Sequence, residues 1–354
     1  MSTTPTWPII LSALLRGENL AISEASWAMQ QVMSGDATPS QLAGFLVALS
    51  AKGETVDEIV GFRDAVLANA EPLTLGALAL DIVGTGGDQL GTVNVSTMAS
   101  IVASASGVPI AKHGNRAASS ASGSSDVLGA LGLNLELEPR EVARVFAETG
   151  ITFAFASLFH PGFRHAAVTR RELGIPTVFN FLGPLCNPAR PEASAVGVAN
   201  LAKVHLIVGV FQTRGATALV FRGDDGLDEL TTTGHSHIWE VSRGAVTEHD
   251  FDPLELGIPR AQISDLLGGD AVHNAGIARA TLGGERGPVR DIVLLNAAAG
   301  LVAWQLARDP AQAQRSLIER FAVQLAIVTD AVDSGRAAAK LDEWVAASNS
   351  GRSS

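Results

Sequence analysis

Two glycine-rich turns carry the residues best suited to chemistry in this sequence. The first, Gly84-Thr85-Gly86-Gly87-Asp88, follows a short apolar run and precedes Asn94-Val95-Ser96-Thr97, which opens a predicted helix. Glycines let a backbone turn sharply and approach a ligand, and the free amides of a helix start attract phosphate. The spacing is not the dinucleotide G-x-G-x-x-G, and no Gly-Lys-Ser/Thr follows, so neither a Rossmann nor a Walker motif is present. Taken alone, this turn fits phosphate binding and a plain strand-to-helix connection equally well.

The second turn is Lys112-His113-Gly114-Asn115-Arg116, which also follows a short apolar run. A serine-rich stretch comes next and contains Ser119, Ser120, Ser122, Ser124 and Ser125. Serine and glycine are ordinary loop residues, so this segment could be a solvated loop. Two phosphate-compatible turns in succession favour an anionic ligand instead.

Acidic and basic residues elsewhere suggest how such a ligand could be held. Asp225, Asp228 and Glu229 follow the apolar run Ala218–Gly223, and Mg²⁺ prefers one or two carboxylates together with phosphate oxygens. Arg170 could hold a carboxylate with its planar guanidinium group, although arginine on a helix is more often a surface ion-pair partner.

Several other groups have weaker claims to a function. His235 and His237 have a spacing that could ligate a metal, but no third ligand is evident. Cys186, the single cysteine, is expected to be a packed thiol. His160 and His165 are as compatible with a structural role as with a pocket lining.

The elements that must position these residues are predicted from periodicity and caps. Thr38-Pro39-Ser40-Gln41 and Thr55-Val56-Asp57-Glu58 are capping boxes, each followed by apolar residues at helical spacing. They predict a small helical domain over residues 1–75.

From about residue 76 short apolar runs alternate with helix-compatible segments. The runs are Ala77–Val83, Val108–Ala111, Gly150–Ala156, Val196–Val198, Val204–Phe211 (also of core-strand length) and Ala218–Gly223. Helices are expected at 93–105, 289–307 and 317–332. This order predicts a mostly parallel sheet covered by helices over residues 76–350, with ligands bound beyond the carboxyl ends of its strands. The fold class is therefore α/β, with a small N-terminal helical domain.

Composition restricts the class of protein. The chain has 354 residues with 47% hydrophobic content and a net charge of −11, which disfavours disorder and general nucleic-acid or anionic-membrane binding. One cysteine excludes an internal disulfide, and no signal peptide or membrane-spanning run is evident. We expect a cytoplasmic protein.

With these motifs in order, the sequence closely resembles the anthranilate phosphoribosyltransferase family. The matching motifs extend through most of the chain: Gly84–Asp88, Asn94–Thr97, Lys112–Arg116, His160-Pro161, Arg170–Gly174, Phe179–Pro188 and Asp225–Glu229. The resemblance implies Mg²⁺-dependent transfer of the 5-phosphoribosyl group from phosphoribosyl diphosphate to the amine of anthranilate, the second step from chorismate to tryptophan. It also implies the nucleoside phosphorylase/phosphoribosyltransferase type of fold and a homodimer formed through the helical domain, to which a segment near 184–201 returns.

The resemblance also assigns residues to each ligand. The diphosphate donor would be held by Gly84, Gly87, Asp88, Thr92, Asn94, Val95, Ser96, Thr97, Lys112, His113, Gly114, Asn115, Arg116, Ala117, Ala118, Ser119, Ser120 and Ser124. Anthranilate would face Gly84, Asn115 and Arg170. Two Mg²⁺ ions per subunit would be held by Ser96, Asp228 and Glu229. No residue is a certain catalytic group, because the acceptor amine already has a lone pair; His113 is a weak candidate for receiving its proton.

Two rival interpretations remain at this point. A pyrimidine nucleoside phosphorylase has a related architecture but should carry a lysine–serine–glycine phosphate loop, where this chain has Lys112-His113-Gly114-Asn115. A non-catalytic homologue that serves as a nucleic-acid or interaction module should have lost Gly84–Asp88 or the Asp228-Glu229 pair and gained a basic surface, and neither change is seen.

Overall fold

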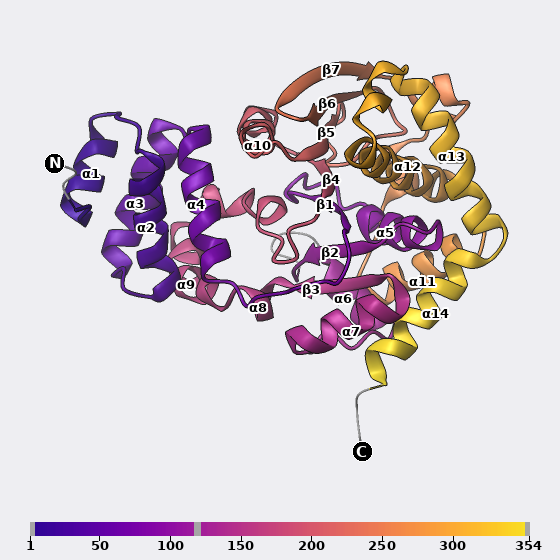
Figure 1. Cartoon of the computed structure of the whole chain (residues 1–354), viewed down its shortest axis with the longest axis horizontal. Helices are drawn as coiled ribbons and strands as arrows, with labels where there is room; N and C mark the ends of the chain where they lie inside the picture. The colour runs from indigo at the N-terminus through magenta and orange to yellow at the C-terminus, as the bar shows by residue number, and fades with distance from the viewer. Residues whose placement is uncertain (1–3, 117–121, 351–354) are drawn as a thin grey trace.

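The computed structural model describes residues 4–116 and 122–350, which form a helical bundle beside a larger α/β unit (Figure 1). The bundle contains α1 (Trp7–Leu15), α2 (Ile22–Ser34), α3 (Pro39–Lys52) and α4 (Val56–Ala68). Both predicted capping boxes are confirmed. The hydroxyl groups of Thr38 and Thr55 accept the amides of Gln41 and Glu58, whose side chains accept the threonine amides in return.

A seven-stranded sheet forms the centre of the α/β unit, in the order β3-β2-β1-β4-β5-β6-β7. The first five strands along the chain are parallel, whereas β6 and β7 extend the sheet as an antiparallel hairpin. The strands are β1 (Leu80–Gly84), β2 (Ile110–Gly114), β3 (Ile151–Phe155), β4 (Ala193–Gly197), β5 (Thr217–Gly223), β6 (Ser236–Ser242) and β7 (Ala245–Phe251). The predicted mostly parallel sheet is confirmed.

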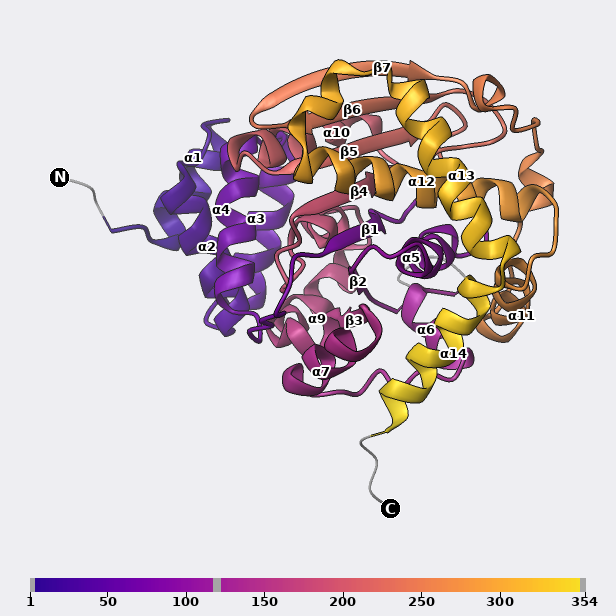
Figure 2. The same ribbon diagram turned by 45° about the vertical axis from the view of Figure 1, so that its right-hand side comes forward.

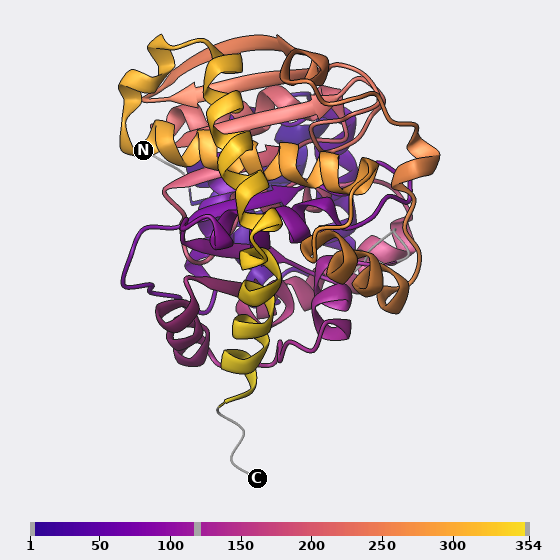
Figure 3. The same cartoon turned by 90° about the vertical axis from the view of Figure 1, so that its right-hand side faces the viewer.

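Helices cover both faces of the sheet. One face is packed by α5, α12, α13 and α14, and α14 runs down this side of the molecule in Figures 2 and 3. The other face meets α10 and the helical bundle. The helices of the α/β unit are α5 (Val95–Ala105), α6 (Ser124–Ala130), α7 (Pro139–Thr149), α8 (Ala156–Phe159), α9 (Arg164–Leu173), α10 (Leu201–Thr213), α11 (Ala271–Leu282), α12 (Pro288–Arg308), α13 (Leu317–Asp333) and α14 (Arg336–Asn349). Short 3-10 helices lie at Pro161–Phe163, Val178–Asn180, Gly183–Leu185, Pro253–Leu256, Ile263–Leu266 and Pro310–Gln314.

Side chains of β1 alternate between two hydrophobic clusters. Leu80 and Ile82 of β1 join the cluster formed with α5 and α12, whereas Val83 joins the cluster shared with the helical bundle. Helix α12 is long and apolar enough to cross a membrane, yet 83% of its most apolar stretch is buried in the protein. It is therefore the core helix of the α/β unit.

Two expectations from the sequence were wrong, the second of them in part. The run Val204–Phe211, of core-strand length, lies within helix α10, which packs between the sheet and α4 and is apolar over most of this run, with His205 exposed. The segment 184–201 does not return to the helical bundle as a whole, because β4 takes residues 193–197 into the centre of the sheet. Leu185 and Cys186 do share a hydrophobic cluster with the bundle, and α9 packs against α2 and α3.

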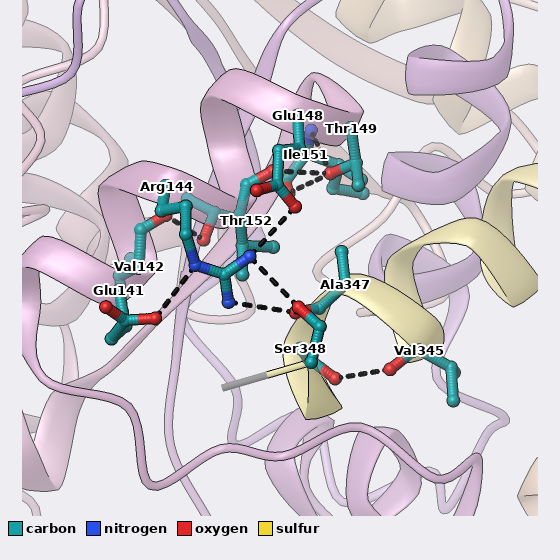
Figure 4. A network of polar contacts seen from close by, with 12 residues as sticks. Glu141, Val142, Arg144, Glu148, Thr149, Ile151, Thr152, Val345, Ala347 and Ser348 are labelled. Atoms are coloured by element: carbon teal, nitrogen blue, oxygen red, sulfur yellow. Dashed lines mark hydrogen bonds and ion pairs between the residues drawn. The ribbon is translucent and has the colours of Figure 1, made fainter. Parts of the chain in front are cut away.

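Arg144 of α7 connects this helix to the C-terminal helix α14 (Figure 4). Its guanidinium group donates to Glu141 and Glu148 on its own helix and, at 3.0 Å, to the carbonyl oxygen of Ala347 in α14. Ser348 is buried within α14, and its hydroxyl group accepts the amide of Asn134.

Candidate functional site

The carboxyl ends of β1, β2 and β4 are glycines, and the structure shows why larger residues would not fit at two of them. A Cβ atom at Gly84 would overlap the Asp228 carboxylate, and one at Gly197 would overlap the Asp228 backbone carbonyl. Gly84 and Gly197 are partners in the β1–β4 register. The loop that follows β5 thus passes directly over the ends of two neighbouring strands.

This close approach connects the acidic loop to the glycine-rich turn and to the start of α5. Asp228 Oδ2 accepts the Gly86 amide at 2.7 Å, and Glu229 Oε1 accepts the Ser96 amide at 3.1 Å. Asp225 has a different role, since its carboxylate accepts the hydroxyl groups of Thr231 and Thr233 and so shapes the loop. The three predicted metal-binding residues, Ser96, Asp228 and Glu229, therefore lie together.

Negative charge is concentrated at this point with little water around it. Asp228 and Glu229 are 9% and 8% exposed. Burial, and then the neighbouring Asp88, raises the pKa of Asp228 to about 7. Burial, followed by Asp228, raises the pKa of Glu229 well above its usual value. A divalent ion bound at these carboxylates would stabilise their charged forms.

Lys112 supplies the buried positive charge of the site. Its ammonium group donates to the carbonyl of Ile82 at 2.7 Å and to Ser96 Oγ at 3.3 Å. Burial lowers the pKa of Lys112, and the charges of Asp81, Glu229 and Asp228 oppose that change. The basic residue predicted from the second turn therefore lies beside the first turn.

No three of the described His, Cys, Asp and Glu side chains converge closely enough to hold a metal ion by themselves. Asp228 and Glu229 nevertheless fit Mg²⁺, because this ion usually keeps several waters and takes one or two carboxylates plus phosphate oxygens. The hydroxyl group of Ser96 lies beside them.

The glycine-rich turn is supported by a segment that sequence reasoning missed. Thr92 pairs with Leu267 in an isolated antiparallel bridge, and the Val93 amide donates to Leu266. Asn274 of α11 donates to Asn94 Oδ1 at 2.9 Å. Gly268-Gly269 preceding a capped helix was the available signal, but nothing in it indicated which loop it would support.

The other predicted donor residues are divided between the site and its surroundings. Gly87, Asp88 and Thr97 lie on the turn and on α5, and Val95 is buried in the core. Gly114 faces Ser124 Oγ closely, which brings the start of α6 to the end of β2. Ala117, Ala118, Ser119 and Ser120 lie outside the described residues.

Asn115 and Arg116 are exposed beyond the end of β2. Asn115 Oδ1 accepts the Ser157 hydroxyl at 3.0 Å, and the Arg116 guanidinium lies 5.8 Å from the centre of the Phe155 ring at the end of β3. Both residues thus connect the second turn to the neighbouring strand end.

A row of aromatic rings runs from the end of β2 to α9. The His113 and His160 rings are 5.2 Å apart, those of His160 and Phe163 are 5.3 Å apart, and those of Phe163 and Phe179 are 5.8 Å apart. At the far end, the Arg170 guanidinium lies 5.1 Å from the centre of the Phe179 ring. The sequence indicated Arg170 but not this aromatic row.

Arg170 and the two histidines present polar groups that could bind a ligand. Burial lowers the pKa of Arg170, and no carboxylate in the described chain forms an ion pair with it. Nε2 of His113 is buried without a hydrogen-bond partner among the described residues, and the His160 ring is buried beside the backbone of Cys186. Such groups suit a ligand that carries both an aromatic ring and polar substituents.

His113 is held neutral. Its Nδ1 lies 3.1 Å from the Gly183 carbonyl oxygen, so Nδ1 carries the proton and Nε2 a lone pair. Burial, followed by His160, lowers the pKa of His113 to about 3.

The groups with weaker claims lie elsewhere. His235 contacts Asp250 and Asp252 on the antiparallel hairpin side of the sheet. Cys186 is completely buried, and burial raises the pKa of its thiol to about 12. His165 is exposed on α9.

Comparisons with known proteins agree with this geometry. Residues 8–70 match the helical bundle domain of a glycosyl transferase family and residues 76–337 match its a/b domain. The curated anthranilate phosphoribosyltransferase of Leifsonia xyli subsp. xyli is 68% identical over 347 residues, which cover 98% of this chain and 99% of the relative.

Two solved structures have the same fold along their whole length. The anthranilate phosphoribosyltransferase of Thermus thermophilus has a TM-score of 0.87 at 41% identity, covering 96% of this chain and 99% of that one. The Saccharomyces cerevisiae enzyme in complex with PRPP and Mg has a TM-score of 0.87 at 26% identity, covering 97% and 98%. The chain therefore belongs to the anthranilate phosphoribosyltransferase family.

Proposed function

We propose that this site transfers the 5-phosphoribosyl group of phosphoribosyl diphosphate to the amine of anthranilate, releasing diphosphate, in the second step of tryptophan biosynthesis from chorismate. The observation that carries the proposal is the convergence of Asp228 and Glu229 on the Gly84–Asp88 turn and the start of α5, with an aromatic row and Arg170 leading away from the same strand ends. The names of the family's members supply the substrates.

The donor is proposed to lie across the first two turns. The amide of Ser96 is at a helix start, where the partial positive charge of the helix favours phosphate. In the described structure the Glu229 carboxylate accepts this amide. A phosphate group bound at this helix start would compete with Glu229 for the amide. We therefore expect the Glu229 carboxylate to turn toward a metal ion when phosphoribosyl diphosphate binds.

Two Mg²⁺ ions per subunit are proposed, held by Ser96, Asp228 and Glu229 together with donor oxygens. When bound, Mg²⁺ offsets the negative charge that develops on the leaving diphosphate. The solved yeast relative was crystallised with PRPP and Mg, which supports the metal but not the number of ions. The protein's own contribution is the buried ammonium group of Lys112 and the oriented amides of the turn, which are fixed before the C1–O bond breaks.

Anthranilate is proposed to lie on the aromatic row with its carboxylate against Arg170. The unpaired guanidinium can hold a carboxylate through two hydrogen bonds, and the rings of His160 and Phe163 provide a flat apolar wall. Gly84 and Asn115 would border the amine end. The amine needs no activation, so positioning it near C1 of the ribose accounts for much of the rate enhancement.

His113 is the candidate for the amine proton. Its unpartnered Nε2 carries a lone pair, and the protonated arylamine formed by the attack is a strong acid that a weak base can deprotonate. No observation favours the phosphorylase or a nucleic-acid-binding homologue over this assignment.

A cytoplasmic homodimer formed through the helical bundle is also proposed, with the bundle assigned to residues 1–75 and the catalytic unit to residues 76–350. Helix α1 is almost wholly apolar and leaves Ile9 and Leu15 exposed, and Val47 of α3 is exposed as well. A second copy of the chain could cover these side chains.

The reaction can be followed by the loss of anthranilate fluorescence in the presence of phosphoribosyl diphosphate and Mg²⁺. We expect a decrease that requires all three components and stops when Mg²⁺ is chelated. Product formation from thymidine and phosphate, with no reaction of anthranilate, would overturn the proposal.

A further inference from the structure

The ladder between β1 and β2 stops early. β1 is paired with β4 at five positions, from Leu80–Ala193 to Gly84–Gly197, and β2 is paired with β3 at five positions. All residues of β1 and β2 are described in the structure, and these two strands are paired at one position, Leu80–Ile110. The backbone groups that follow on these two strands therefore need other partners, since every residue except the terminal Gly84 and Gly114 is buried.

Side chains supply those partners. Lys112 Nζ donates to the Ile82 carbonyl at 2.7 Å, and Asp81 Oδ1 accepts the His113 amide at 3.2 Å. Asn187 Nδ2 donates to the Ala111 carbonyl at 2.8 Å.

Two of these side chains are also joined to each other. Asn187 Nδ2 donates to Asp81 Oδ2 at 2.9 Å, and Asn187 Oδ1 accepts the Ala189 amide at 2.9 Å. Asp81, Lys112 and Asn187 are each at most 3% exposed. We call these three residues the β1–β2 wedge.

The wedge lies just before the site. Neighbouring strands of an intact ladder run about 4.8 Å apart, and side chains inserted between them separate the two backbones. The turns that follow these strands, Gly84–Asp88 and Lys112–Arg116, are the two that would hold the donor. Asn187 also belongs to the segment whose Gly183 carbonyl accepts Nδ1 of His113, so the same segment fixes that ring.

We propose that Asp81 and Asn187 are positioning residues for the transfer reaction, which hold the two donor-binding turns at the required separation and keep His113 oriented. This inference rests on the proposed function. Neither residue touches the reacting atoms; both act through the strands that carry Lys112 and His113.

Hydrogen-bond chemistry explains why these residue types are needed. The Asp81 carboxylate faces the amides of His113 and Ile82 and the side-chain amide of Asn187, and a carboxylate can accept from donors on both of its oxygens. In Asp81→Asn, either orientation of the new amide group leaves two donors facing each other. In Asn187→Asp, two carboxylates meet and the Ala111 carbonyl loses its donor.

The exchange Asp81→Asn with Asn187→Asp restores the pair in reverse. The new asparagine can accept the His113 amide and donate to the new aspartate, which still accepts the Ala189 amide. Only the contact to Ala111 is lost. The two single variants and the exchange thus form a double-mutant cycle.

The test measures kcat and both KM values at a temperature at which circular dichroism shows every variant to be folded. Because misplacement of about 1 Å can cost about 100-fold in rate, we expect each single variant to lower kcat/KM for phosphoribosyl diphosphate at least tenfold. The double variant should have a kcat/KM at least fivefold higher than that of either single variant. Thr149→Val is the matched control; it also removes a buried hydroxyl with its hydrogen bonds, at the opposite end of β3 (Figure 4), and should keep kcat and both KM values within twofold.

The inference is overturned if both single variants lower the melting temperature as Thr149→Val does but keep kcat and both KM values within twofold of the parent. Asn187→Ser, which retains one hydrogen-bond donor, is the second variant should the isosteric ones fail to fold. An unchanged KM for phosphoribosyl diphosphate in this variant would also overturn the inference. Calorimetric binding of inorganic diphosphate with Mg²⁺ gives a readout independent of turnover. Absence of product from the parent chain would instead refute the proposed function, while weaker diphosphate binding by the single variants would still support the wedge.

Discussion

Replacing His160 by phenylalanine should make the protein less sensitive to acid. His160 is 2% exposed, and burial, opposed by a backbone hydrogen bond to Cys186, lowers the pKa of its imidazole ring to about 4. The folded protein therefore keeps this ring neutral at pH values at which the unfolded chain protonates it. Its contribution to stability is fully present above pH 6.5 and is lost as the pH falls toward the folded pKa.

The size of the effect follows from the pKa difference. An unperturbed histidine has a pKa of about 6.5, and each pH unit below that value costs about 1.4 kcal/mol until the folded pKa is reached. Between pH 6.5 and pH 5 the parent should lose about 2 kcal/mol of unfolding free energy through His160. His113 should add a similar loss, because its pKa is lowered to about 3.

Phenylalanine at residue 160 can keep the ring contacts with His113 and Phe163 and has no group to protonate. The free energy of unfolding can be measured by urea denaturation at pH 8, 6.5 and 5. At pH 8 the parent and the variant should differ by less than about 1 kcal/mol. On going to pH 5 the parent should lose about 2 kcal/mol more than the variant does. Phe163→Leu is the control, because it weakens packing in the same row equally at each pH. Parallel losses of stability in the parent and in His160→Phe would refute the reasoning.

Three further predictions concern the site itself. Arg170→Ala should raise the anthranilate KM at least tenfold and the donor KM less than twofold in steady-state assays; equal effects on both would remove Arg170 from the acceptor site. Glu229→Gln should lower turnover strongly and abolish its rise with Mg²⁺ concentration, and wild-type kinetics across a Mg²⁺ titration would contradict the metal assignment. Gly197→Ala should yield little soluble protein with a clearly lowered melting temperature, because the new Cβ would overlap the backbone of Asp228; a variant as stable as the parent would show that the loop above β4 yields easily.

Local sequence signals predicted much of the fold. The capping boxes at Thr38 and Thr55 fixed two helix starts, because each involves neighbours in the chain. Strand ends followed by glycine or charge indicated where the site would form. The interpretation of Val204–Phe211 failed because six of its eight residues are buried in the helix, so that His205 alone is too little to reveal a helical period.

The site was predicted less completely, for a physical reason. Family motifs placed Ser96, Asp228 and Glu229 together, and the structure brings them into contact. The β1–β2 wedge could not be predicted, because Asn187 and Asp81 are 106 residues apart in the sequence and meet only in the folded chain. The aromatic row likewise depends on how the strand ends and α9 are arranged.

The order of the strands has one more consequence, for self-association. A sheet that ends in β3 on one side and β7 on the other has two edges with unused backbone groups, the feature on which fibrils grow. Every residue of β3 is buried. β7 is largely exposed but carries Glu248 and Asp250, whose like charges would repel the same strand of another molecule. Neutralising those two carboxylates would remove that repulsion from the exposed edge, which β6 and β5 separate from the strands β4 and β1 that carry the site.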